Sequence, residues 1–179
     1  MYFIIHTETV EDILPIENII ALEIYNHICE YKTNSGDART HYDMLLKHGK
    51  RLYCVATDDN HTVESSCGGW TMIKAKNLTY EEIISAIEQG HFYASTGPEI
   101  YEYYVLDDKL CIECSPVKKI HVKSNTIGHV QSIMAGENEY FTHYEFDFSN
   151  LKDLPYFRFE IVDDRGKQAF TNPYYLQNT

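Results

Sequence analysis

The chain has 179 residues, enough for one large domain or two small ones with a buried core. Its 27 acidic residues outnumber its 15 basic ones, giving a formal net charge of −12 that argues against nucleic-acid binding through a basic surface. Tyrosine is abundant, with 15 residues, which suits sheets whose faces are partly hydrated.

The cysteines favour a reducing compartment. They are odd in number and scattered, a pattern typical of free thiols rather than of a disulfide framework. Cys111 and Cys114 form a C-x-x-C motif, but two such positions in a strand face opposite sides, so an apolar strand is predicted rather than a zinc or redox site. Neither a membrane span nor a signal peptide is indicated, so we expect a soluble, cytoplasmic protein with no membrane partner.

Strands and helices alternate in the first part of the chain. Apolar runs at 2–5, 19–25 and 52–56 predict strands. Residues 38–48 show apolar side chains at helical spacing, and Gly49 follows as a helix-terminating glycine would. Strand, helix and strand in this order are typical of a parallel sheet covered by helices.

A second strand–helix–strand segment follows Gly68 and Gly69. Residues 70–75 predict a strand, and Thr79 with Glu82 forms a capping box that opens a helix. Gly90 ends this helix, whose apolar stripe consists of Ile83, Ile84 and Ile87. Residues 91–94 predict the next strand.

The pattern changes after Pro98, where helical periodicity is lost. Short strands separated by turn signals are predicted at 100–105, 110–114, 119–123, 140–148, 156–162 and 168–171. Residues 163–166, Asp-Asp-Arg-Gly, predict a hairpin turn. We therefore expect two domains, an α/β domain at 1–97 and a small all-β sandwich at 98–179.

An Asp-x-His motif follows the apolar run 52–55. Asp59 and His61 are two positions apart, so in an extended chain their side chains point the same way. A carboxylate and an imidazole placed together suit a divalent metal. The sequence therefore predicts metal ligands at the end of this strand.

Three segments resemble one known family. They are SGDARTHYDMLLKHGKRLYCVATDDNH at 35–61, GGWTMIKAKNLTYEEIISAIEQGHFYASTGPEI at 68–100 and DDRGKQAFTNPYYL at 163–176. Together they are similar to the C-terminal half of the polymerase-and-histidinol-phosphatase (PHP) superfamily, and in particular to PHP-like metal-dependent phosphoesterases with an appended β domain. The resemblance implies that this chain is part of a distorted (β/α)7 barrel followed by a β-sandwich.

The resemblance also implies roles for individual residues. Asp59 and His61 match the last metal-binding motif, and Asp58 would be a supporting catalytic residue that orients a ligand or a metal-bound water. Glu23 and Asn26 lie in the segment EIYN and would face the metal-binding rim, although a strand-end cap and turn explain them equally well. His6 falls on an earlier strand, where a rim ligand or an ordinary strand histidine would fit.

The family's His-x-His strand does not occur in this sequence. We therefore expect a C-terminal portion of a metal-dependent phosphoesterase, incomplete as a catalyst by itself, in which zinc, manganese or iron activates water to hydrolyse a small phosphorylated substrate. The alternative is a non-enzymatic module for assembly or ligand binding on a degenerate remnant of the barrel. A partial barrel would leave an open sheet edge, which predicts self-association.

Overall fold

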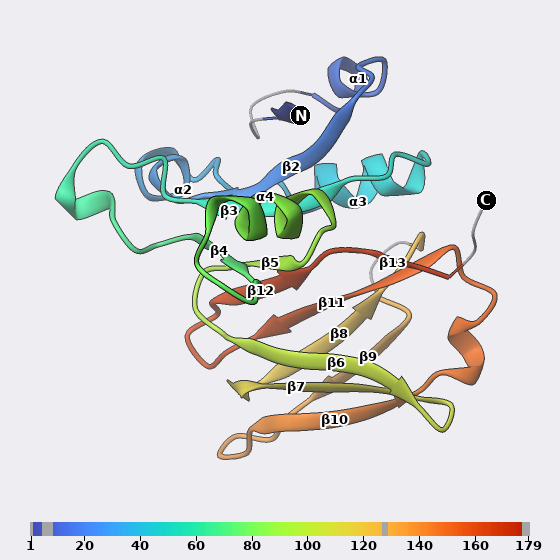
Figure 1. Ribbon diagram of the computed structural model, residues 1–179. Coiled ribbons are helices and arrows are strands. Elements are labelled where there is room, and N and C mark those ends of the chain that lie inside the picture. Colours follow the sequence, from blue (N-terminus) through green and yellow to red (C-terminus); the bar gives the residue numbers. More distant parts are fainter. Residues whose placement is uncertain (1, 5–8, 127–128, 177–179) are drawn as a thin grey trace. The chain divides into compact units, whose positions relative to one another are not determined.

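The computed structural model describes residues 2–4, 9–126 and 129–176 (Figure 1). Strands predominate over helices in the described residues. The chain divides into two compact units, Met1–Thr96 and Gly97–Thr179, called the first and second unit below. In the described part of the chain, no helix has the length and apolar character needed to cross a bilayer.

The first unit contains short helices and two groups of strands. Its elements are β1 (Tyr2–Ile4), α1 (Val10–Ile13), β2 (Ile19–Asn26), α2 (His27–Thr33), α3 (Arg39–Lys47), β3 (Tyr53–Thr57), the 3-10 helix η1 (Val63–Ser65), β4 (Trp70–Ile73), α4 (Tyr80–Glu88) and β5 (Phe92–Ser95). Strand β2 lies between β1 and β3, and both pairings are parallel. The parallel pairing predicted for 19–25 and 52–56 is therefore confirmed.

The centre of the parallel sheet is its most buried part. Six of the eight residues of β2 are buried and the other two are half-buried, as expected for a strand that pairs on both sides and is covered by helices. Helix α3 buries Tyr42, Leu45 and Leu46. The hydroxyl group of Tyr42 donates a hydrogen bond of 2.8 Å to the carbonyl oxygen of Leu52, which ties α3 to the start of β3. This packing fixes where β3 begins.

The predicted partial (β/α)7 barrel followed by a β-sandwich is wrong as a fold class. In such a barrel each strand pairs in parallel with the next, whereas β4 pairs antiparallel with β5. The hydroxyl group of Thr71 in β4 instead bonds to the backbone of Ala56 in β3, accepting from its N–H at 3.2 Å and donating to its carbonyl at 3.0 Å. A side chain thus links β3 to β4, and the chain is a small β-rich fold with mostly antiparallel pairing.

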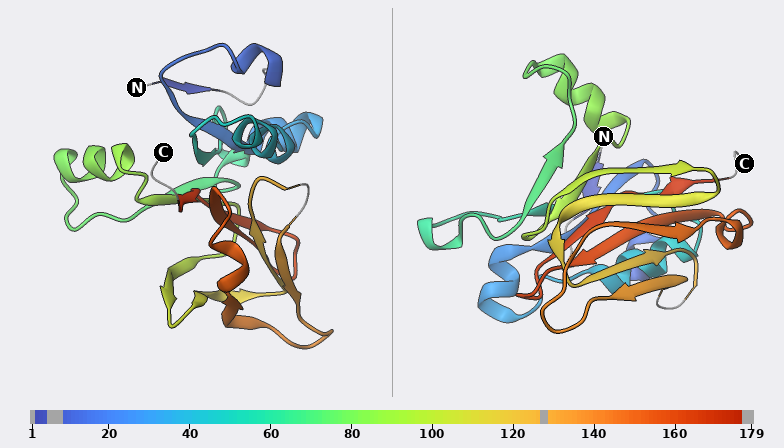
Figure 2. Two further views of the ribbon diagram at one scale, coloured as in Figure 1. Left: turned by 90° about the vertical axis from the view of Figure 1, so that its right-hand side faces the viewer. Right: turned by 90° about the horizontal axis from the view of Figure 1, so that it is seen from below.

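The connection between β4 and β5 explains the error. A parallel crossover must carry the chain back along the whole strand. Here the backbone N–H of Lys74 bonds to the carbonyl of His91 at 2.8 Å, so the connection leaves and returns at the same end of the pair. Helix α4 stands beyond that end (Figure 2). Thr79 caps it as predicted, accepting from the N–H of Glu82 at 3.4 Å.

The second unit consists of two antiparallel sheets. Its elements are β6 (Ile100–Leu106), β7 (Lys109–Val117), β8 (Lys119–Lys123), β9 (Gln131–Met134), β10 (Phe141–Asp147), the 3-10 helix η2 (Ser149–Leu151), β11 (Tyr156–Val162), β12 (Gln168–Thr171) and β13 (Tyr174–Tyr175). One sheet has the order β10-β7-β6, and in the other β12, β11, β8 and β9 are neighbours, with β13 also on β11.

Aromatic side chains join the two sheets of the second unit. The ring of Phe159 in β11 lies 5.8 Å from that of Tyr103 in β6 and 6.2 Å from that of Phe146 in β10, measured between centroids. Phe159 is fully buried. Such ring pairs add to the free energy gained by burying their surface. Phe159, in the strand predicted at 156–162, therefore lies in the core between the two sheets of the second unit.

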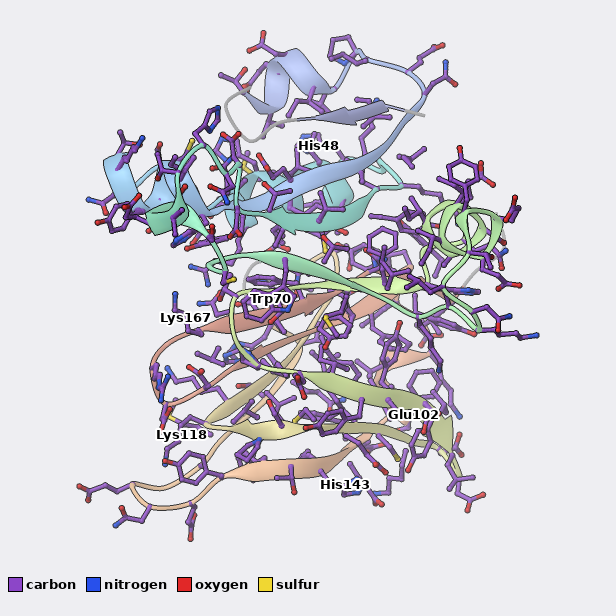
Figure 3. The ribbon with its side chains drawn as sticks, turned by 60° about the vertical axis from the view of Figure 1, so that its left-hand side comes forward. His48, Trp70, Glu102, Lys118, His143 and Lys167 are labelled. Carbon is purple, nitrogen blue, oxygen red and sulfur yellow. The ribbon has the colours of Figure 1, made fainter. Side chains whose placement is uncertain are left out.

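Lys118, between β7 and β8, holds the loop that joins β9 to β10 (Figure 3). Its ammonium group donates to the carbonyl oxygens of Gly136 at 2.9 Å, Glu137 at 2.7 Å and Glu139 at 2.7 Å. It also lies 4.1 Å from the ring centroid of Tyr140, a cation–π contact. The ammonium group of Lys118 thus holds the loop between β9 and β10 in place through three carbonyl groups.

We expect Lys118→Met to lower the free energy of unfolding of the second unit by about 1–3 kcal/mol, because three carbonyl groups lose a charged donor. Chemical denaturation with fluorescence detection measures this value. Lys119→Met removes the same charge from the next residue and serves as the control. Equal effects of the two substitutions would contradict the role of the three hydrogen bonds.

Candidate functional site

The predicted site residues lie where β2 and β3 end. Both strands run in parallel, and Asn26, the last residue of β2, is the register partner of Thr57, the last residue of β3. The carboxyl ends of parallel strands meet at one edge of a sheet, where ligand sites commonly form. The segment 58–61 continues directly from this edge.

The side-chain amide of Asn26 connects the two strand ends. Its Nδ2 atom donates to Glu23 Oε2 at 3.1 Å and to Asp59 Oδ2 at 3.3 Å. Its Oδ1 atom accepts from the N–H of Cys29 at 3.0 Å, so Asn26 also caps α2. The side chain is buried, and one amide therefore fixes two carboxylates and the start of a helix.

The carboxylate of Glu23 is buried, since only 8% of this residue is exposed. Besides Asn26, the hydroxyl group of Thr57 donates to its Oε1 atom. Burial of a carboxylate is costly unless donors or a cation compensate its charge. Glu23 thus has a hydrogen-bond donor on each oxygen, supplied by the ends of β2 and β3.

Asp59 and His61 come together, but not through the extended geometry expected from their spacing. Asp59 has a φ of 48°, in the left-handed region, so the chain turns immediately after β3. The Nδ1 atom of His61 lies 2.7 Å from the backbone oxygen of Asp59 and 3.8 Å from its Oδ1 atom. Both side chains are exposed. A turn therefore places the imidazole beside the carboxylate.

Asp58 holds a loop rather than facing the other carboxylates. Its side chain accepts hydrogen bonds from the backbone N–H groups of Cys67 at 2.6 Å, Gly68 at 2.8 Å and Gly69 at 2.9 Å. Burial acts to raise the pKa of Asp58, but the three backbone donors and the nearby His27 outweigh it and leave the pKa below its ordinary value of 3.8. Asp58 thus positions the segment before β4.

Sequence reasoning missed a row of rings beside these residues. The ring of His27 lies 6.4 Å from that of Tyr25 and 6.1 Å from that of Tyr31, measured between centroids. Gly68 and Gly69 pack against this row, since a Cβ atom at Gly68 would lie 2.1 Å from the His27 ring and one at Gly69 would lie 2.9 Å from Tyr25. The Gly-Gly pair was the available signal, because adjacent glycines indicate close approach of the backbone.

The donor set suits a divalent metal, although the side chains are not gathered around one point. Two carboxylates and an imidazole, from Glu23, Asp59 and His61, are ligands that zinc, manganese and iron accept. Among the described residues, no group of three His, Cys, Asp or Glu side chains is close enough to hold a metal. His6 lies outside the described residues.

A second polar cluster occupies the sheet of β6, β7 and β10 (Figure 3). Glu102 and His143 are both register partners of Glu113. The Nδ1 atom of His143 lies 4.0 Å from a carboxylate oxygen of Glu113, and its Nε2 atom lies 3.6 Å from one of Glu145. These ion pairs are exposed, so they contribute little to stability, and we assign no site to them.

We expect Gly68→Ala to destabilise the first unit by about 1–3 kcal/mol, because the added methyl group overlaps the His27 ring. Thermal unfolding measures the loss. Gly136→Ala is the matched control, since its added methyl group would meet only the flexible end of Glu139. A Gly68→Ala protein as stable as the control would show that the loop does not pack on His27.

The lowered pKa of Asp58 makes stability depend on pH. Because the folded-state pKa lies below the ordinary value of 3.8, the stabilisation is present above that value and is lost as the pH falls through the folded-state pKa. We expect Asp58→Asn to be less stable than the wild type at neutral pH and to lose less stability toward about pH 2. Denaturant titrations across this range measure both curves, and parallel curves would contradict the assignment.

Comparison of the sequence with protein-family models found no match, and neither did comparisons with curated proteins and with solved structures. Function is therefore inferred from the side chains at the carboxyl ends of β2 and β3.

Proposed function

We propose that the carboxyl ends of β2 and β3 contribute to a divalent-metal site that hydrolyses a small phosphate ester. The observation that carries this proposal is the convergence of Glu23, in β2, and Asp59, in the turn after β3, on the single amide of Asn26. His61 adds an imidazole next to Asp59. Asp59 and His61 also lie in the segment 35–61 that resembles PHP-like phosphoesterases, and this resemblance adds to the support.

Asp59 and His61 would contribute ligands to the metal, which we expect to be zinc, manganese or iron, and Glu23 would face the same rim from β2. When bound, such a metal activates water and polarises the phosphate ester. Asn26 keeps the two carboxylates on one side of the strand ends through its hydrogen bonds. Asp58 acts as a positioning residue, since its carboxylate is engaged by three backbone N–H groups.

The negative charge of the strand ends explains why the proposed reaction needs a metal. Glu23 and Asp59 present negative charge at the place where an anionic phosphate would have to bind, and like charges repel. A divalent cation reverses the local charge and so makes binding of the phosphate favourable. We therefore expect hydrolysis to depend strictly on added metal.

A second candidate is a non-enzymatic module for assembly or ligand binding, in which self-association could use an open sheet edge. It is favoured by one observation: no three potential ligands are gathered in the described part of the chain. In either case, a cytoplasmic location remains part of the proposal.

The test is metal binding by isothermal titration with Zn²⁺ and Mn²⁺, together with hydrolysis of p-nitrophenyl phosphate by the metal-loaded protein. We expect Asp59→Ala and His61→Ala each to weaken metal binding by about ten-fold or more, because each removes one ligand. Hydrolysis should be slow and should disappear when the metal is chelated.

Glu64→Gln is the matched control, because it neutralises an exposed carboxylate of η1 in the same loop. Equal metal affinity in the wild type and the Asp59→Ala variant would contradict the assigned ligands. Metal binding without any hydrolysis would favour the second candidate.

A further inference from the structure

The row of rings at the start of α2 is the strongest feature outside the proposed metal ligands. Tyr25, His27 and Tyr31 are neighbours in space, and their exposure increases outward, from half-buried Tyr25 to Tyr31, which is 68% exposed. The hydroxyl group of Tyr25 also lies 3.5 Å from His27 Nδ1. The row thus presents aromatic surface to the solvent.

The two inner rings of the row, those of Tyr25 and His27, are held from behind by backbone. Gly68 and Gly69 lie against His27 and Tyr25, and Asp58 fixes both glycines through their N–H groups. A further hydrogen bond of 3.2 Å runs from the N–H of Ile28, in the first turn of α2, to the carbonyl of Asp58. Rings that are already ordered lose little conformational entropy when a ligand binds.

Negative charge surrounds the inner end of the row. Burial raises the pKa of Tyr25, and the carboxylates of Glu30, Asp37 and Asp58 raise it further. These carboxylates are held in place, Glu30 by the N–H of Gly36 at 3.0 Å and Asp58 by the loop. Asp37 is paired with a neighbouring arginine, which leaves Glu30 and Asp58 as the main sources of negative potential.

We propose that the rings of Tyr25, His27 and Tyr31, together with the carboxylates of Glu30 and Asp58, bind an organic cation of the alkylammonium class. The faces of aromatic rings attract such cations, and ordered carboxylates beside the rings strengthen the attraction. An anionic or neutral apolar ligand would gain only the contact with the rings.

This binding site stands next to the proposed metal ligands, because His27 directly follows Asn26 in the chain. Insofar as the inference rests on the proposed function, it names the substrate class: a phosphate ester of an amino alcohol, with its phosphate at the strand ends and its ammonium group on the rings. Cation binding by itself does not require that the strand ends hydrolyse anything.

The experiment is a titration of the metal-free protein with choline chloride at constant ionic strength, followed by NMR of the tyrosine and histidine ring protons. The neutral isostere 3,3-dimethyl-1-butanol, titrated in parallel, reports contact without charge. We expect choline to shift the ring signals of Tyr31 and His27 saturably, and the isostere to bind at least about five-fold more weakly.

Two variants complete the test. Tyr31→Leu should weaken choline binding by about five-fold, whereas Tyr101→Leu, which removes a tyrosine of similar exposure from β6, should leave the affinity unchanged. Equal affinity for the isostere, or an unchanged affinity in Tyr31→Leu, would overturn the inference. Because no metal is present, failure of phosphate hydrolysis leaves this result unaffected, and each proposal can fail separately.

Discussion

The buried amide of Asn26 is the interaction on which the candidate site depends. Asn26 is the last residue of β2 and also caps α2, so strand, helix and the two carboxylates of Glu23 and Asp59 meet at one side chain. Its amide can donate two hydrogen bonds and accept from the helix at once. A buried polar group of this kind is costly when a partner is missing, so each partner restrains the positions of the others.

The site tolerates a high density of negative charge because most carboxylates have dedicated donors. Asp58 accepts three backbone N–H groups, and Glu23 accepts from Asn26 and Thr57. Asp59, by contrast, is exposed beside His61. The hydrogen-bonded carboxylates of Glu23 and Asp58 thus stabilise the fold, and the exposed Asp59 and His61 are the residues that a ligand can reach first.

Local sequence signals were reliable where one element decides its own structure. The helix cap at Thr79 and the strand predicted at 156–162 both occur in the structure. The turn at Asp163 does as well, since its carboxylate accepts from the N–H groups of Arg165 and Lys167. Helix α2 was missed because its seven residues are too few to show a clear apolar period. Its cap, Asn26, was nevertheless noted as a candidate.

The sequence by itself determined the order of most strands and helices and the residues at the ends of β2 and β3, because these depend on short-range periodicity. It also determined the parallel pairing of β2 with β3, because a helix between two strands returns the chain in the same direction. Only the tertiary structure decided that β4 turns back on β5, because the direction of pairing depends on where a connection returns. It also decided that Asp58 faces a glycine loop, because this contact joins segments whose spacing in the chain carries no signal of contact. Tyr25, His27 and Tyr31 form one row because α2 brings His27 and Tyr31, four residues apart, onto the same side, and this helix was not predicted.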